Sequence, residues 1–304
     1  MNRTRWLPAA LLVIALAAGS ISSAPSNPPI TLGGYRVLAA DFHVHPGFLA
    51  GGAVAPWDIA MLARRQGLDV LAVTPHNQIY SARMARWFSH WFLSMTGGPT
   101  IIIGEEVRTA PYHIIAIGIE KRIAPQGPAS EVIDAIHAQG GVAIAAHPFP
   151  EFWPGFDDEA MKRLDGSEVM HTSVYKNAGA GPAFLQFYLR KKMTAIGSSD
   201  YHGLGVLGMC RTFVFARGNS AQDVLDALKA GRTVVYDLNG SAYGDPELIR
   251  LAGQDGRLRE RGTPPQQNGL TAWISRICAI AALLGILGYG FSDKSFTTEK
   301  SKNL

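Results

Sequence analysis

The sequence contains little cysteine and few charged residues. Two of its 304 residues are cysteine, Cys210 and Cys278, and neither belongs to a CxxC pair. We therefore expect no disulfide, and we interpret both as unpaired structural thiols. Charged residues make up 17% of the chain and apolar residues 47%. This balance excludes intrinsic disorder and predicts a folded protein with a large core and some membrane character.

The chain also lacks a concentration of positive charge. Its formal net charge is +4, and its lysine and arginine residues are scattered rather than gathered in a stripe with aromatic residues. Nucleic acid is therefore not an expected partner. The length suits one large domain or two small ones.

The N-terminal end has the pattern of a membrane-directed segment. Arg3 and Arg5 precede an apolar run and then a zone of small residues. We interpret residues 1–24 as a signal peptide or an anchor, because a basic start followed by a short apolar run is typical of both. Residues 25–34, rich in proline, serine and glycine, are expected to be a linker.

The C-terminal end contains a second apolar run. Residues 270–291 have one charge, Arg276, and predict a transmembrane helix that contacts membrane lipid. A linker at 256–269 would precede this helix, and a polar tail at 292–304 would follow it. Together with the signal-like start, the run predicts a membrane-anchored protein. Its globular domain, residues 35–255, is expected outside the cytoplasm, in the periplasm or at the cell surface.

Short apolar runs alternate with amphipathic runs from residue 35 onward. The alternation predicts an α/β fold with a mostly parallel sheet and helices outside it, as in a closed barrel. In such barrels the active site gathers at the carboxyl ends of the strands. The predicted strands are residues 35–40, 68–74, 100–103, 113–119, 141–146, 167–170, 193–197, 211–216 and 233–236.

Two short motifs at strand ends contain metal-binding residue types. DFHVH contains His43 and His45, and SSDYH contains Asp200 and His202. Residues i and i+2 of a strand point to the same face, so each pair can converge on one pocket. Imidazole and carboxylate groups at such spacing are the ligands that transition metals use. The motifs therefore predict a metal-dependent hydrolase.

Further polar residues end other predicted strands. His76, Glu106 and His147 should join the two motifs at the carboxyl ends of the barrel. Only one of Glu105 and Glu106 can line the pocket, because adjacent residues of a strand point to opposite faces of the sheet.

Six motifs occur in the order and approximate spacing of the PHP superfamily, named after polymerase and histidinol phosphatase domains. The resemblance implies a distorted barrel of seven β/α units that holds two or three divalent metal ions, Mn, Fe or Zn. The later stretch GMCRTFVFARGNSAQDVLDALKAGRTVVYD further resembles the carbaryl-hydrolase-like branch. The six motifs, between about Tyr35 and Leu251, are DFHVH, AVTPHN, IGEEV, YHIIAIG, AAHPF and GSSDYHG.

The resemblance also implies roles for single residues. His43 and His45 resemble the first histidine pair of the family. Glu106 resembles the carboxylate that bridges two metals, which favours it over Glu105, and Asp200 would complete the shell of the first metal.

Ligands of the other metals follow from the same resemblance. His113 and His147 resemble ligands of the second metal, and His76 and His202 resemble ligands of a third. Many relatives have another histidine or aspartate shortly after the first histidine pair, whereas this chain has PGFLAGGA at 46–53. The acidic residue of the common TDH motif is also absent. We therefore expect two tightly bound ions, with His76 and His202 holding a weak third or contacting substrate.

Three other residues are predicted to support the site. Asp41 precedes the histidine pair and is expected to orient a ligand. Lys176 and Arg211 are candidates for clamping an anionic substrate.

The remaining histidines are interpreted as structural. His90 and His137 fall on predicted helices, away from strand ends. His171 ends a short strand and could reach the pocket, but no motif assigns it a role.

These observations lead to a phosphoesterase as the favoured function. A metal-bound hydroxide at a di- or trinuclear site would attack a small, anionic ester substrate, with His202 or His76 as the catalytic proton carrier. Three alternatives remain: a carboxyl-ester or carbamate hydrolase of the same fold, a non-catalytic membrane-tethered binding module, and a nuclease or polymerase-associated proofreader, which the absence of a basic groove disfavours.

Overall fold

The computed structural model describes most of the chain and divides it into two compact units. One unit comprises Met1–Ser23 with Gln266–Leu304, and the other comprises Ala24–Pro265. We refer to them as the terminal unit and the barrel unit. The described residues are 6–21, 29–47, 51–93, 97–177, 179–203, 205–261, 273–275 and 277–286.

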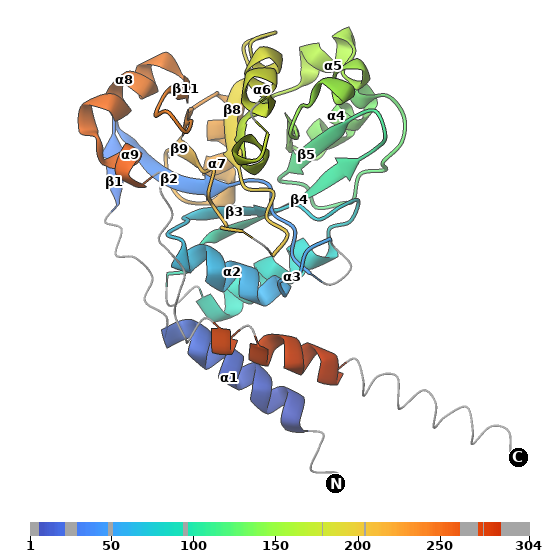
Figure 1. The fold of residues 1–304 in the computed structure, drawn as a ribbon, viewed down its shortest axis with the longest axis vertical. Coiled ribbons are helices and arrows are strands. Elements are labelled where there is room, and N and C mark those ends of the chain that lie inside the picture. Colours follow the sequence, from blue (N-terminus) through green and yellow to red (C-terminus); the bar gives the residue numbers. More distant parts are fainter. Residues whose placement is uncertain are drawn as a thin grey trace, which may run out of the picture. The chain divides into compact units, whose positions relative to one another are not determined.

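The barrel unit is built on a twisted sheet whose strands alternate with helices (Figure 1). Its strands are β1 (Ile30–Leu32), β2 (Tyr35–Asp41), β3 (Val70–Val73), β4 (Thr100–Arg108), β5 (His113–Ile117), β6 (Val142–Ala145), β7 (Gly166–His171), β8 (Thr194–Ser198), β9 (Thr212–Ala216), β10 (Thr233–Tyr236) and β11 (Ala242–Gly244). Its α-helices are α2 (Pro56–Arg65), α3 (Tyr80–Phe88), α4 (Ala129–His137), α5 (Asp158–Arg163), α6 (Ala180–Tyr188), α7 (Ala221–Lys229), α8 (Pro246–Asp255) and α9 (Arg257–Arg261).

The sheet forms a nearly closed barrel. Ten strands follow the order β11-β10-β9-β2-β3-β4-β5-β6-β7-β8, and β1 pairs with β2. The two sides of the opening approach each other through side chains. Thr233 Oγ1 donates to the carbonyl of Ala195, and the amide of Gly197 donates to Thr212 Oγ1. These contacts bring β8 against β9 and β10, so the α/β barrel predicted from the sequence is present.

The barrel departs from a regular series of seven β/α units. β2, β3 and β4 are parallel neighbours, as are β6, β7 and β8. β4 and β5 instead form an antiparallel pair without an intervening helix, and β9 is antiparallel to both β2 and β10. A tight connection permits only antiparallel pairing, whereas a parallel pair needs a long crossover. The reversal of β5 therefore follows from the short connection between residues 108 and 113.

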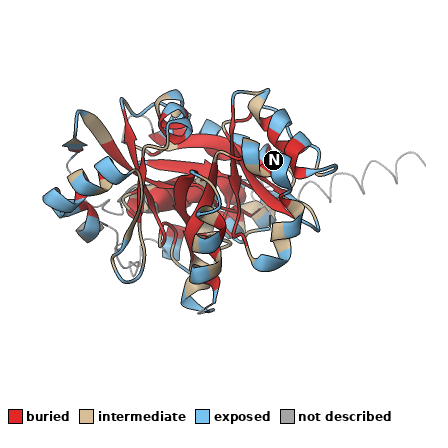
Figure 2. Cartoon of the chain, turned by 90° about the horizontal axis from the view of Figure 1, so that it is seen from above, coloured by how far each residue is buried: buried red, intermediate tan, exposed pale blue. Residues whose placement is uncertain are grey.

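The core joins the strands to one face of α7. Buried residues cluster in the strands and in the faces of the helices turned toward them, while blue, exposed residues lie outward (Figure 2). Val224, Leu225 and Leu228 of α7 belong to the same apolar cluster as Leu38 and Ile144 of the strands. Ser220 and Asp223 form a capping box that fixes the start of α7. Apolar burial at roughly 25 cal/mol per Å² makes this cluster a main source of barrel stability.

Both predicted linkers contain regular structure. Ile30–Leu32, inside the expected linker 25–34, forms β1 because Gly33 and Gly34 adopt positive φ and turn the chain back onto β2. Within the expected linker 256–269, Arg257–Arg261 forms α9. Gly33 and Gly34 form the turn, and pairing with β2 makes residues 30–32 of the expected linker a strand.

The terminal unit contains α1 (Leu7–Ile21) and helical residues at 273–275 and 277–286. The predicted transmembrane helix at 270–291 is not found: no helix among the described residues is long and apolar enough to cross a bilayer. The described helical stretches are shorter than the roughly 20 residues that a span requires. The rest of 270–291 and the tail at 292–304 lie outside the described residues.

Candidate metal centre

Histidine and carboxylate side chains from six strands converge at one place in the barrel unit. His43 and His45 follow β2, His76 follows β3, Glu106 lies on β4 and His113 begins β5, while His147 follows β6, and Asp200 and His202 follow β8. Their ligand atoms form overlapping groups of three within 4.8 Å of one another, a spacing that a metal ion could bridge. The structure thus brings together all eight residues that the sequence predicted as metal ligands, although their role in binding metal stays a prediction.

The first group surrounds one oxygen of Glu106. Nε2 of His43 lies 3.5 Å from Glu106 Oε2 and 3.3 Å from Asp200 Oδ1. Nε2 of His45 lies 3.5 Å and 2.9 Å from the same two oxygens. Both histidine side chains are fully buried. Two imidazole nitrogens and two carboxylate oxygens therefore face one point, which is the donor set of a four-coordinate transition-metal site.

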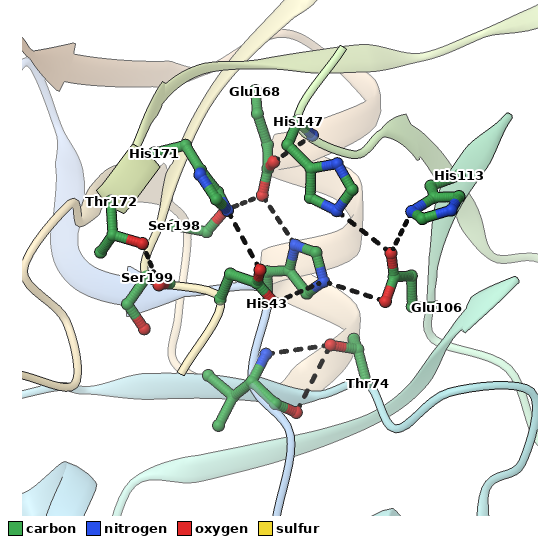
Figure 3. Close-up of polar contacts among 12 residues, drawn as sticks. His43, Thr74, Glu106, His113, His147, Glu168, His171, Thr172, Ser198 and Ser199 are labelled. Atoms are coloured by element: carbon green, nitrogen blue, oxygen red, sulfur yellow. Dashed lines mark hydrogen bonds and ion pairs between the residues drawn. The ribbon is translucent and has the colours of Figure 1, made fainter. Parts of the chain in front are cut away.

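The second group surrounds the other oxygen of Glu106. Nδ1 of His113 lies 2.9 Å and Nε2 of His147 lies 3.2 Å from Glu106 Oε1 (Figure 3). Because the two oxygens of Glu106 face separate histidine groups, this carboxylate has the position of a bridge between two cations. We refer to His43, His45, Glu106, His113, His147 and Asp200 as the inner cluster.

The alternation of β4 separates the two adjacent glutamates. Glu106 faces the histidines, whereas Oε1 of Glu105 accepts a hydrogen bond of 3.1 Å from the amide of Ile123. Burial raises the pKa of Glu105 to about 7, against the hydrogen bond from Ile123. The two carboxyl groups therefore occupy opposite faces of one strand, as the period of two requires.

A third group lies nearer the surface. His45, His76 and His202 can approach one ion, and Nε2 of His76 also lies 2.9 Å from Glu106 Oε2. The side chains of His76 and His202 are 26% and 37% exposed, compared with 21% for Asp200 and at most 11% for the other members of the inner cluster. A Cβ atom on Gly51 would lie 2.8 Å from His76 Nδ1, so backbone fills the space beside this ring. We refer to His76 and His202 as the outer pair.

The sequence interpretation missed two inward-facing residues of β7. Oε1 of the buried Glu168 lies 3.0 Å from Nδ1 of His43, and its Oε2 accepts from the amide of His147 (Figure 3). Nε2 of His171 lies 3.4 Å from Asp200 Oδ2. Strict alternation would send residues 168 and 171 to opposite faces. The register shift between Glu168 and Met170 allows both side chains to face inward. A single sequence contains no reliable signal for such a bulge.

Glu168 orients the first histidine. Because a carboxylate only accepts, Nδ1 of His43 donates to Glu168, which leaves Nε2 of His43 free to face Glu106 and Asp200. A carboxylate behind a metal-binding imidazole is a recurrent arrangement. Burial opposes ionisation of Glu168, but the charge of His43 and its neighbours lowers its pKa to about 2.

The electrostatics of the inner cluster favour a cation. Burial opposes protonation of His43, yet Asp200, Glu168 and Glu106 raise its pKa well above the ordinary value. Burial likewise opposes ionisation of Asp200 and Glu106, but the charge of His43 and close contacts with other histidines keep both pKa values low. His45 differs, because burial lowers its pKa to about 4. Three ionised carboxylates in a buried space require positive charge nearby.

Several buried polar atoms at the site have no hydrogen-bond partner. Five of these seven atoms lie at ion-pair distances from a facing group but without hydrogen-bond geometry. Buried polar atoms are normally satisfied, so such a concentration at one point indicates ligand atoms arranged around a cation. The donor set therefore fits divalent metals. These atoms are Nε2 of His43, both ring nitrogens of His45, Nδ1 of His113, Nδ1 of His147, Nε2 of His171 and Oδ1 of Asp200.

Backbone strain is concentrated at the same place. Asn77, His147 and Asp200 are the non-glycine residues with positive φ in the described part of the chain, at 49°, 25° and 48°. Such conformations cost of order 1–3 kcal/mol each and persist where surrounding contacts enforce them. Two of these residues belong to the inner cluster, and the third follows His76.

The three predicted supporting residues have different surroundings. Asp41 is buried and accepts from the amides of His43, Ser199 and Gly208, so it joins the chain at His43 to the chain around Asp200, and its predicted role in orienting a ligand stays a prediction. Lys176 lines the cavity beside the metal centre. Arg211 does not: its guanidinium is buried and donates to the carbonyls of Gly208 and Gln66. Its predicted substrate contact is therefore replaced by a structural one.

A cavity of about 610 Å³ opens onto the metal centre. One wall carries His147, His171, Asp200 and His202. The other residues around it are Phe149, Thr172, Ser173, Tyr175, Lys176, Ser199, Tyr201, Gly205, Val206 and Met209. The cavity is large enough for a small organic molecule.

Comparisons with known proteins agree with this geometry. The sequence profile of a family described as PHP-associated matches residues 185–233, which include Asp200 and His202. An uncharacterised protein of Methanocaldococcus jannaschii is 28% identical over 145 residues, or 44% of this chain and 82% of that protein. A two-domain protein of Bacteroides vulgatus, described as containing a predicted PHP-like metal-dependent phosphoesterase, has a similar fold, with a TM-score of 0.60 and 24% identity. The alignment covers 76% of this chain and 74% of that one.

The PHP-associated match is confined to residues 185–233, and the likeness to the Bacteroides vulgatus protein shows a shared fold. None of them distinguishes the carbaryl-hydrolase-like branch, which stays a prediction.

Proposed function

We propose that this protein is a metal-dependent phosphoesterase that acts on a small anionic ester. The observation that carries the proposal is the position of Glu106, whose two oxygens each face a separate set of histidines. Two divalent ions held there would lower the pKa of a water molecule toward neutrality and neutralise charge on phosphoryl oxygens.

The chain's own residues would orient and protonate the substrate. The outer pair lies beside the inner cluster and remains partly exposed, so His202 or His76 can exchange protons with a leaving group at the cavity side. Nδ1 of His202 lies 2.9 Å from the carbonyl of Asp200, which orients the ring. Lys176 supplies positive charge at the cavity for an anionic substrate.

A carboxyl-ester or carbamate hydrolase is the second candidate. Phe149, Val206 and Met209 line the cavity, and such apolar walls suit a neutral ester. The same activated water can attack a carbonyl carbon.

The test is hydrolysis by the full chain after loading with Mn²⁺ or Zn²⁺. Bis-p-nitrophenyl phosphate, p-nitrophenyl phosphate and p-nitrophenyl acetate are compared, with His43→Ala as the inactive variant and His90→Ala as the matched control. Phosphoester turnover that is lost only in His43→Ala supports the proposal. Turnover of the acetate alone supports the second candidate. Bound metal without turnover of any substrate favours the non-catalytic module.

A further inference from the structure

The terminal unit joins segments from the two ends of the chain. Ser275 Oγ donates a buried hydrogen bond of 2.8 Å to the carbonyl of Ala15. At the other end of the contact, a Cβ atom on Gly285 would lie 2.7 Å from Cγ and 3.3 Å from Cβ of Pro8. Residue numbers rise along one helix while they fall along the other, so α1 and the helical residues 273–286 are antiparallel. We refer to these two segments as the helix pair.

Small side chains form the contact within the helix pair. Ala15, Ser275, Ala279 and Ala282 are at most 1% exposed. Small residues allow two backbones to approach closely, and a hydroxyl that donates to a carbonyl of the facing helix adds a directed bond. Helices that associate in lipid are joined in this way, since they gain nothing by burying large apolar side chains against each other.

Large apolar side chains point away from the contact. Val13, Ile277 and Leu284 are 64%, 61% and 64% exposed. A water-soluble helix pair would place these residues inside and polar residues outside, whereas this pair does the opposite. The other exposed apolar residues are Trp6, Leu7, Ile14, Trp273, Ile274, Ile280 and Ile286.

The ends of the helix pair also match a lipid environment. Trp6 precedes α1, and Trp273 begins the other helix, so the antiparallel arrangement puts one exposed tryptophan at each end. Tryptophan is enriched where lipid meets water. In the sequence, Arg3 and Arg5 precede Trp6, and the stretch after residue 286 contains Lys294, Lys300 and Lys302, so that five cationic residues stand against two acidic ones, Asp293 and Glu299. These charges complement anionic lipid headgroups.

We propose that α1 is retained in the mature protein and that the helix pair is one lipid-binding unit that tethers the barrel unit to a membrane. The occupant of its outward face is a bilayer that contains anionic lipid. Neither helix is then a separate signal or anchor, because each covers the small-residue face of the other.

Flotation with vesicles of phosphatidylcholine and phosphatidylglycerol tests the lipid contact on the full chain. We expect the unmodified protein to float and the double variant Val13→Glu, Leu284→Glu to partition at least tenfold less. Trp91→Glu is the matched control, since Trp91 is equally exposed, at 64%, but belongs to the barrel unit. Loss of flotation only in Trp91→Glu would overturn the proposal. So would absence of flotation combined with a dimer in solution, which would make the outward face a contact between copies.

Cross-linking tests the pairing and the retention of α1. The 3.3 Å approach of Cβ positions is close to disulfide geometry, so Pro8→Cys with Gly285→Cys should form an intrachain bond in a Cys278→Ser background. Val13→Cys with Gly285→Cys is the control and should not form it, because Val13 points outward. The intact mass of protein from the membrane fraction should include residues 1–23. Removal of that segment, or an interchain bond, would contradict the proposal.

Discussion

The inner cluster and the outer pair lie side by side yet differ in almost every physical property. The inner cluster is buried except for Asp200, contains the two carboxylates that face the histidines, and is bound from behind by Glu168. The outer pair is partly exposed and has neither Glu nor Asp of its own. The backbone of Gly51 lies beside the ring of His76. We therefore expect the inner cluster to hold metal, and the outer pair to hold a weak third ion or to contact substrate.

The largest effect is expected from neutralising Glu106, whose two carboxylate oxygens face the two histidine groups of the inner cluster. Glu106→Gln should lower kcat/KM by about 10³-fold or more and reduce bound metal, because an amide cannot bridge two cations. Turnover measures the loss of kcat/KM, and elemental analysis measures the bound metal. Glu105→Gln is the matched control on the opposite face of the same strand. Equal losses in both variants would show that the inner cluster is misassigned.

A smaller effect is expected in the outer pair. His202→Ala should lower kcat by about 10²-fold, which is typical for loss of a general acid or base, while the metal held by the inner cluster is retained. Turnover and metal content are measured on the same sample. If turnover and metal content fall in proportion, His202 is a ligand of a tightly held ion. The outer pair would then not differ from the inner cluster in holding metal.

Glu168 tests the support behind the inner cluster. Glu168→Gln should weaken metal affinity by roughly 10–100-fold, because the partner of His43 Nδ1 loses its charge while its size is kept. Titration of the metal-free protein with Zn²⁺ measures the affinity. His137, which pairs with Asp165 at 2.7 Å, offers an analogous pair outside the site. Asp165→Asn is therefore the control, and an equal loss there would assign the effect to stability.

The smallest effect concerns stability rather than catalysis. The pKa of Glu105 is raised to about 7 by burial, above its ordinary value of 4.5. The folded state therefore binds more protons than the unfolded state between these values, and its stability falls as the pH rises from about 4.5 to 7. Glu105→Gln should remove this slope, which corresponds to roughly 2–3 kcal/mol. Urea unfolding at pH 5 and pH 8 measures it. An unchanged slope would contradict the assignment.

Much of the barrel could be predicted from the sequence. Apolar runs ending in polar residues located all the strands from β2 to β10, and i, i+2 spacing placed His43 beside His45. Period-two alternation also separated Glu105 from Glu106. These features depend on local spacing, which a single sequence contains.

Other features depend on partners that are distant along the chain. Glu168 and His171 share the site because a register shift in β7 turns both inward. Arg211 left the predicted substrate clamp because two backbone carbonyls bind its guanidinium. The sequence by itself determined the residue types and the order of the strands, because these follow from local periodicity. Only the tertiary structure decided which carboxylate stands behind His43 and how the ends of the chain pair, because these contacts join residues more than 100 positions apart.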